Sequence, residues 1–172
     1  MSSLARVVLT FMMVSMTACV THRLNATMHG QAARASQLAG LSITMGGDTS
    51  ATLGGGLHIW LRVRNQTDSV VHIFLAGSAS GFNPVVEDET GRVIWDRVHG
   101  TLIADAPAGV PIPAHGERTY TTTWGLVDWN GNPVPPGRYL VRGRLLLDSR
   151  YAGQPFVDAE NSPLHFVIRP KK

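Results

Sequence analysis

The chain has 172 residues, of which 44% are hydrophobic and 16% are charged, and its formal net charge is +3. This length supports one domain with a sizeable core, and this composition excludes a chain that is disordered throughout. A net charge this small is not the basic footprint of a nucleic-acid-binding protein, so no nucleic-acid partner is expected. Cys19 is the only cysteine, which rules out an intrachain disulfide.

The start of the chain has the pattern of an export signal. Arg6 supplies a positive charge, Val7–Met16 is mostly apolar, and the small residues Thr17 and Ala18 precede Cys19. This pattern predicts a signal peptide over residues 1–18. The apolar run is too short for a bilayer, which takes about 20 apolar residues.

The segment that ends in Cys19 resembles a bacterial lipobox, in which the thiol is lipidated and the cysteine becomes the new N-terminus. The resemblance implies an exported protein, anchored to the cell envelope at its periplasmic or outer surface by lipid on Cys19. Cleavage near Ala18 by an ordinary signal peptidase is the alternative.

Residues 20–39 are polar and rich in alanine, with no sustained apolar stripe. We therefore predict a lipidated tether over residues 19–40 and a folded domain over residues 41–170. As a coil, about 20 residues reach roughly 25 Å, which would let the domain stand off a membrane.

From residue 41 onward, apolar and polar residues alternate in short runs separated by turn signals. Such runs predict strands, and about eight of them with no convincing helix predict an all-β, immunoglobulin-like antiparallel β-sandwich. A partly closed barrel is the alternative. The predicted strands are Leu41–Met45, Leu57–Arg64, Val70–Leu75, Val85–Asp88, Arg92–Trp95, Arg118–Trp124, Arg138–Leu147 and Leu164–Ile168.

Several segments, in order, carry a family resemblance. They are Arg62–Asp68, then Phe82 with Val85–Trp95, then Ile112–Glu117 with Tyr120 and Trp124, and finally Gly131–Tyr139. Together they resemble the intracellular proteinase inhibitor (BsuPI) domain family over about residues 57–147. The resemblance implies an immunoglobulin-like all-β fold, and protease binding by some members makes a BsuPI-type inhibitor the alternative function. Two features depart from the family: Asp96–His99 replaces a segment that usually holds an aromatic residue, and this chain carries an export signal.

Residues typical of catalysis or metal binding form no recognisable motif. There is no Gly-x-Ser-x-Gly nucleophile elbow, and the seven histidines lack the short spacings of a zinc site. Asp88 and Glu89 lack the spaced oxygen ligands of a calcium loop, so we interpret Asp88 as a turn residue that bonds the local backbone. The sequence therefore predicts no enzyme, no metal and no small-molecule cofactor.

Two tryptophans are candidate binding residues. Trp60 and Arg62 share the predicted solvent face of one strand, and tryptophan beside arginine is typical of binding hot spots. Packing of Trp60 under the tether or a long loop is the alternative. Trp129 lies at a predicted loop tip, where packing over Pro133 or Pro135 is the alternative to binding.

Leu102–Pro113 is the candidate inhibitory loop, with Leu102 and Pro107 as its candidate contact residues. Prolines reduce the entropy cost of ordering a loop on binding. A proline-rich edge crossing between the sheets is the alternative. The sequence thus predicts a lipid-anchored, non-catalytic interaction domain whose partner is an envelope protein or a protease.

Overall fold

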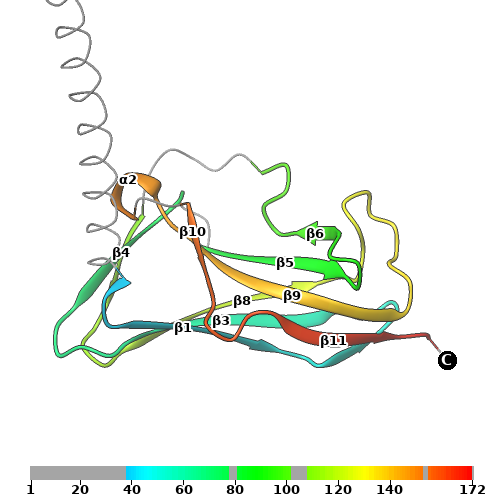
Figure 1. The fold of residues 1–172 in the computed structure, drawn as a ribbon, viewed down its shortest axis with the longest axis horizontal. Helices are drawn as coiled ribbons and strands as arrows, with labels where there is room; N and C mark the ends of the chain where they lie inside the picture. The colour runs from blue at the N-terminus through cyan, green and yellow to red at the C-terminus, as the bar shows by residue number, and fades with distance from the viewer. Residues whose placement is uncertain (1–37, 78–80, 102–107, 153–154, 172) are drawn as a thin grey trace, which may run out of the picture.

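The computed structural model describes residues 38–77, 81–101, 108–152 and 155–171, which form an all-β domain. Its strands run along the long axis of the molecule (Figure 1). They are β1 (Leu41–Gly47), β2 (Ser50–Thr52), β3 (Leu57–Asn65), β4 (Val71–Leu75), β5 (Phe82–Asp88), β6 (Val93–Asp96), β7 (Ala108–Ile112), β8 (Glu117–Trp124), β9 (Gly137–Leu146), β10 (Phe156–Asp158) and β11 (Leu164–Arg169). One helical turn, α2 (Ser149–Ala152), follows β9.

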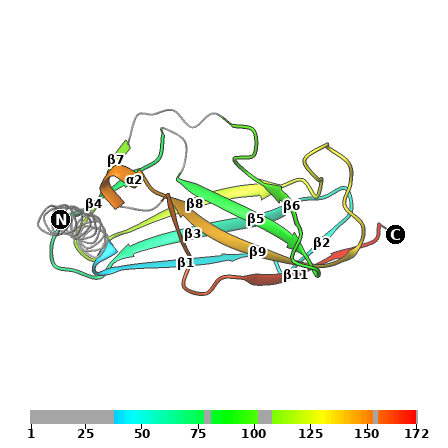
Figure 2. The ribbon, with the colours of Figure 1, turned by 45° about the horizontal axis from the view of Figure 1, so that its top comes forward.

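Two sheets form the layers of a β-sandwich. One has the order β1-β3-β8, and the other has the order β2-β11-β9-β5-β6, with β10 also paired to β9. Figure 2 shows β5 and β9 lying over β3 and β8. Strands β4 and β7 form a separate two-stranded ladder. All of these pairings are antiparallel except that of β2 with β11.

The predicted all-β antiparallel sandwich is confirmed, and each predicted strand is present within a few residues of its predicted bounds. The structure adds β2, β7 and β10, of three, five and three residues. Strands this short show no period in their own sequence, since pairing with a neighbouring strand defines them.

Strand β3 shows why the sequence folds this way. Leu57, Ile59, Leu61 and Val63 are each no more than 1% exposed, and the residues between them point outward. This alternation of apolar and polar side chains places one face of the sheet in the core and leaves the other face to solvent.

The two sheets meet closely at Gly143 of β9. A Cβ atom there would lie only 2.8 Å from the sulfur of Met45 in β1, so the missing side chain permits this approach. Further along, the buried ring of Trp124 in β8 lies 5.9 Å from that of Phe166 in β11 and 6.4 Å from that of Tyr139 in β9. Aromatic contacts across the sandwich therefore join the layers.

A tyrosine corner lies at the start of β9. The Tyr139 hydroxyl donates a 2.6 Å hydrogen bond to the Pro135 carbonyl, four residues earlier. This bond ties the start of β9 to the loop that precedes it.

The sandwich has two distinct ends. The start of β1 pairs with the end of β3 at one end, whereas the β5–β6 hairpin and the loop before β9 lie at the other (Figure 1). Leu38 packs against the core, and the Gly40 carbonyl accepts a hydrogen bond from the Gln66 backbone. Leu38, the first described residue, thus belongs to the folded domain. We call this end the proximal end and the opposite one the distal end.

Candidate functional site

Trp60 lies on the outer face of the β1-β3-β8 sheet. Its ring covers Gly46 on the neighbouring strand, where an added Cβ atom would collide with the indole. The Arg62 guanidinium lies over the same ring at 5.1 Å from its centroid. Trp60 is partly buried by these contacts, so its ring is held flat against the sheet.

Charge on this face is modest and partly paired. Arg62 Nε lies 3.6 Å from Glu117 Oε1 on β8, and both side chains are about half exposed. Arg64 is exposed, and its side chain forms no ion pair with any described residue. Glu160 Oε2 also accepts a 3.1 Å hydrogen bond from the Ser42 hydroxyl at the edge of this face, so two arginines are balanced by two carboxylates.

Small hydroxyl residues flank Trp60 and Arg62 on both sides. Cross-strand partners share a face, so Ser42 and Thr44 of β1 and Thr119, Thr121 and Thr123 of β8 lie beside the β3 residues. We call this surface the Trp60 face: Ser42, Thr44, Gly46, His58, Trp60, Arg62, Arg64, Glu117, Thr119, Thr121 and Thr123.

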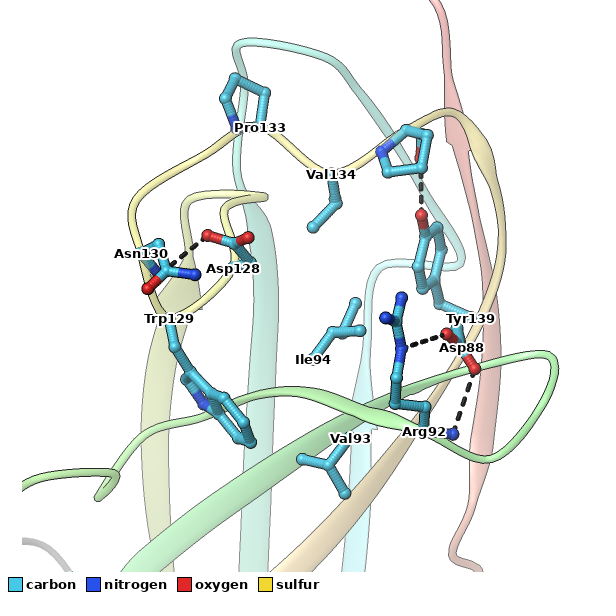
Figure 3. A pocket seen from close by; sticks show the side chains of 11 residues that line it. Asp88, Arg92, Val93, Ile94, Asp128, Trp129, Asn130, Pro133, Val134 and Tyr139 are labelled. Carbon is cyan, nitrogen blue, oxygen red and sulfur yellow. Dashed lines mark hydrogen bonds and ion pairs between the residues drawn. The ribbon is translucent and has the colours of Figure 1, made fainter.

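A pocket of about 330 Å³ lies at the distal end, between the β5–β6 hairpin and the loop before β9 (Figure 3). We call it the Trp129 pocket. Its lining combines apolar, aromatic and charged side chains: Asp88, Arg92, Val93, Ile94, Asp128, Trp129, Asn130, Pro133, Val134, Pro135 and Tyr139.

Asp88 fixes the hairpin side of the pocket. Its Oδ1 accepts hydrogen bonds from the Thr90 hydroxyl at 2.6 Å and from the backbone N–H groups of Thr90 and Arg92. Its Oδ2 pairs with Arg92 Nε at 3.1 Å. The Thr90 hydroxyl, followed by the backbone donors of Arg92 and Thr90, lowers the pKa of Asp88 from 3.8 to about 2. The predicted turn role of Asp88 is confirmed.

Asp128 fixes the opposite side in the same way. Its Oδ1 accepts hydrogen bonds from the backbone N–H groups of Asn130 and Asn132, at 2.8 and 2.9 Å. The Asn132 N–H is the largest cause of a lowered pKa for this carboxyl. Both carboxylates therefore stay ionised through the physiological range and serve as acceptors for their own loops.

Trp129 is one of the few large apolar side chains that remain exposed, at 44%. Its ring stacks on His99, with centroids 4.2 Å apart and planes 11° from parallel. The sequence analysis singled out Trp129 but missed His99, which stacks on it, and Arg92, which lines the same pocket. No local pattern could have paired His99 with Trp129, because the fold alone brings these distant segments together.

The remaining candidate residues fall largely outside the described structure. Cys19, Leu102 and Pro107 lie outside the described residues. The second half of the candidate inhibitory segment, Ala108–Ile112, is strand β7 and pairs with β4, so this half is not a free loop. In the part of the chain that the structure describes, no three His, Cys, Asp or Glu side chains gather to hold a metal ion.

No helix among the described residues has the length and hydrophobicity needed to cross a membrane.

Comparison with known proteins gives distant structural likenesses. No protein-family model and no curated protein matches the sequence. A mutant β-glucosidase from Listeria innocua in complex with laminaribiose is similar at 14% identity and a TM-score of 0.41, over 75% of this chain and 16% of that one. A β-glucosidase from Erythrobacter marinus is similar at 13% identity and a TM-score of 0.44, over 75% of this chain and 15% of that one. The CARDB domain of a Pyrococcus furiosus protein in complex with di-metal ions is similar at 11% identity and a TM-score of 0.40, over 76% of this chain and 94% of that one.

This chain thus spans less than a fifth of the length of these β-glucosidases. Likenesses at this identity and TM-score carry no argument about function.

Proposed function

We propose that this protein is a lipid-anchored component of the bacterial cell envelope whose sandwich domain binds a protein partner through the Trp60 face. The domain catalyses nothing. We also infer that it belongs to the BsuPI-like domains, on the order of the sequence segments that resemble them.

The observation that carries the binding proposal is the fixed position of Trp60. The Trp60 ring lies between Gly46 and Arg62 on an outer sheet face, and the described residues around it are small hydroxyl side chains. An aromatic ring that is already ordered loses little conformational entropy on binding. Tryptophan and arginine are also the residues enriched in the energetic centres of protein interfaces.

The anchor proposal rests on the sequence around Cys19. A tether to Leu38 would place the proximal end of the sandwich nearest the membrane. The Trp60 face runs along the side of the sandwich, so a partner reaches it without displacing the anchor.

Fractionation tests the anchor. Because lipid on Cys19 is the proposed membrane contact, we expect Cys19→Ser to move the protein from the membrane to the soluble fraction. A variant that stays on membranes after washing without detergent contradicts the anchor.

Affinity capture from the native envelope, followed by mass spectrometry, tests the binding face. We expect a partner that wild-type protein and His165→Ala retain and that Trp60→Ala and Arg62→Ala lose. His165 is exposed on β11 of the other sheet, so its variant is a surface substitution outside the Trp60 face. Binding of the same partner by all variants contradicts the Trp60 face.

A protease assay separates this proposal from the inhibitor alternative. We expect the protein at micromolar concentration to leave trypsin-type and subtilisin-type activity nearly unchanged. Inhibition at nanomolar concentration that is lost when Leu102–Pro113 is replaced by a Gly/Ser linker would assign the inhibitor function in its place.

A further inference from the structure

The Trp129 pocket has an apolar floor and a polar rim. Ile94 and Val134 project toward its centre from opposite sides, and Tyr139 closes one wall (Figure 3). At about 330 Å³ the pocket is at the small end of the range for ligand sites. It therefore suits one or two small rings and excludes a folded protein segment.

The aromatic wall of this pocket is held in place before any ligand arrives. Stacking on His99 fixes the plane of the Trp129 indole while leaving 44% of the residue exposed. Rigid loops on both sides, closed by Asp88 and Asp128, hold the surrounding backbone. A fixed aromatic plane favours a ligand with a flat apolar surface of its own.

The charges of the pocket argue against a strongly charged ligand. Asp88 and Asp128 contribute two negative charges and Arg92 one positive charge, which leaves one net negative charge. An anion would meet Asp128, and a cation would meet Arg92. The Arg92 side chain is 77% exposed, and its guanidinium points into the pocket, where it offers N–H donors beyond the Nε that pairs with Asp88 (Figure 3).

We propose that the Trp129 pocket binds a neutral saccharide. A pyranose ring has one apolar C–H face, which stacks on the exposed part of the Trp129 indole, and a rim of hydroxyls that accept from Arg92 and bond Asn130. A neutral polyhydroxyl ring matches both the aromatic wall and the nearly balanced charge. This inference does not depend on Cys19 or on the Trp60 face.

Isothermal titration calorimetry of the full-length protein tests the proposal. The probes are cellobiose and di-N-acetylchitobiose as neutral saccharides, glucuronate as an acidic sugar, and N-acetyl-leucine as a model of a peptide carboxyl end. We expect at least one neutral saccharide to bind with a Kd of about 1 mM or lower. No neutral binding up to about 10 mM, or tighter binding of either anionic probe, overturns the proposal.

Variants locate the site. We expect Trp129→Ala to weaken the neutral saccharide by roughly tenfold, through loss of the stacking surface. Arg92→Ala should weaken it too, and His99→Ala should weaken it less, because the indole remains but loses its support. Trp60→Ala, on the other surface, should bind as wild type.

Thermal unfolding of each variant shows whether it is folded. If Trp129→Ala unfolds, Trp129→Leu and Arg92→Ala decide the question. Leucine keeps an apolar side chain at the loop tip but removes the aromatic plane, and Arg92→Ala keeps the backbone N–H that donates to Asp88. Unchanged affinity in folded Trp129 and Arg92 variants overturns the proposal.

Discussion

The two ends of the sandwich hold their turns by different chemistry. At the proximal end, Asn65 is fully buried, and its amide donates to the carbonyls of Ser69, Ile112 and Pro113 while its Oδ1 accepts from Thr67. At the distal end, Asp88 and Asp128 hold their turns with ionised carboxylates near solvent.

The difference follows from the cost of burying charge. A neutral amide is satisfied by hydrogen bonds alone, whereas a buried carboxylate needs a paired cation. The distal carboxylates keep contact with water and therefore leave charge and polarity at that end, where the Trp129 pocket lies. The proximal turn is a fixed part of the core, and the distal turns frame a surface.

The proximal end should show the largest effect of a single substitution. Asn65→Ala removes the partner of the Thr67 N–H and of the Ile112 carbonyl, whereas the Pro113 carbonyl still accepts from the Gly116 N–H and the Ser69 carbonyl from the Thr67 hydroxyl. We expect a loss of roughly 1–3 kcal/mol in the free energy of unfolding. Urea denaturation measures it. Gln66→Ala is the matched control, because its exposed side chain makes no hydrogen bond within the described structure, and it should be nearly neutral.

Asn65→Asp sharpens the contrast. A carboxylate buried at this position would have a raised pKa in the folded state, since burial disfavours its charged form. Relative to wild type, the variant should therefore be least stable near neutral pH and should recover stability as the pH falls. A stability difference between Asn65→Asp and wild type that is the same at pH 7 and at pH 4 would show that the proximal site tolerates charge and would remove the contrast between the ends.

Tyr139 provides the next largest effect, because its buried hydroxyl serves the distal end. Tyr139→Phe removes the hydrogen bond to Pro135 and should cost about 1 kcal/mol. The control is Tyr120→Phe, whose buried hydroxyl has no hydrogen-bond partner within 3.5 Å among the described residues and has the Arg118 side chain nearby. Removing that hydroxyl should be neutral or slightly stabilising, so equal losses for the two variants in denaturant titrations would contradict the role of the tyrosine corner.

These residues also show which parts of the fold and of the candidate site the sequence could predict. Period two located β3 and the inward position of Leu61, and local turn chemistry located the role of Asp88. The segment Asn65–Asp68 matches a turn by composition, but which of its polar residues is buried depends on Ile112 and Pro113, 47 and 48 residues away. Trp129 stood out as a loop-tip tryptophan, whereas its partner His99 follows only from the fold.

The smallest effect at neutral pH concerns Asp88, and this effect should disappear in acid. Its pKa in the folded protein is about 2, below the ordinary 3.8, so the folded state favours the ionised carboxylate. Its contribution to stability is therefore fully present above about pH 4 and is lost as the pH falls toward 2. Asp88→Asn keeps an oxygen acceptor but cannot ionise, so its melting temperature should lie slightly below that of wild type at pH 7.

Thermal unfolding between pH 7 and pH 2 should show the two proteins converging in acid. Asp128 and Asp148 also have lowered pKa values, so both proteins lose stability there, and only the difference between them reports on Asp88. Glu89→Gln removes the neighbouring exposed carboxylate, which makes no hydrogen bond within the described residues, and should follow wild type throughout. A difference between wild type and Asp88→Asn that stays constant down to pH 2 would mean that the distal turn, like the proximal one, is held without its charge.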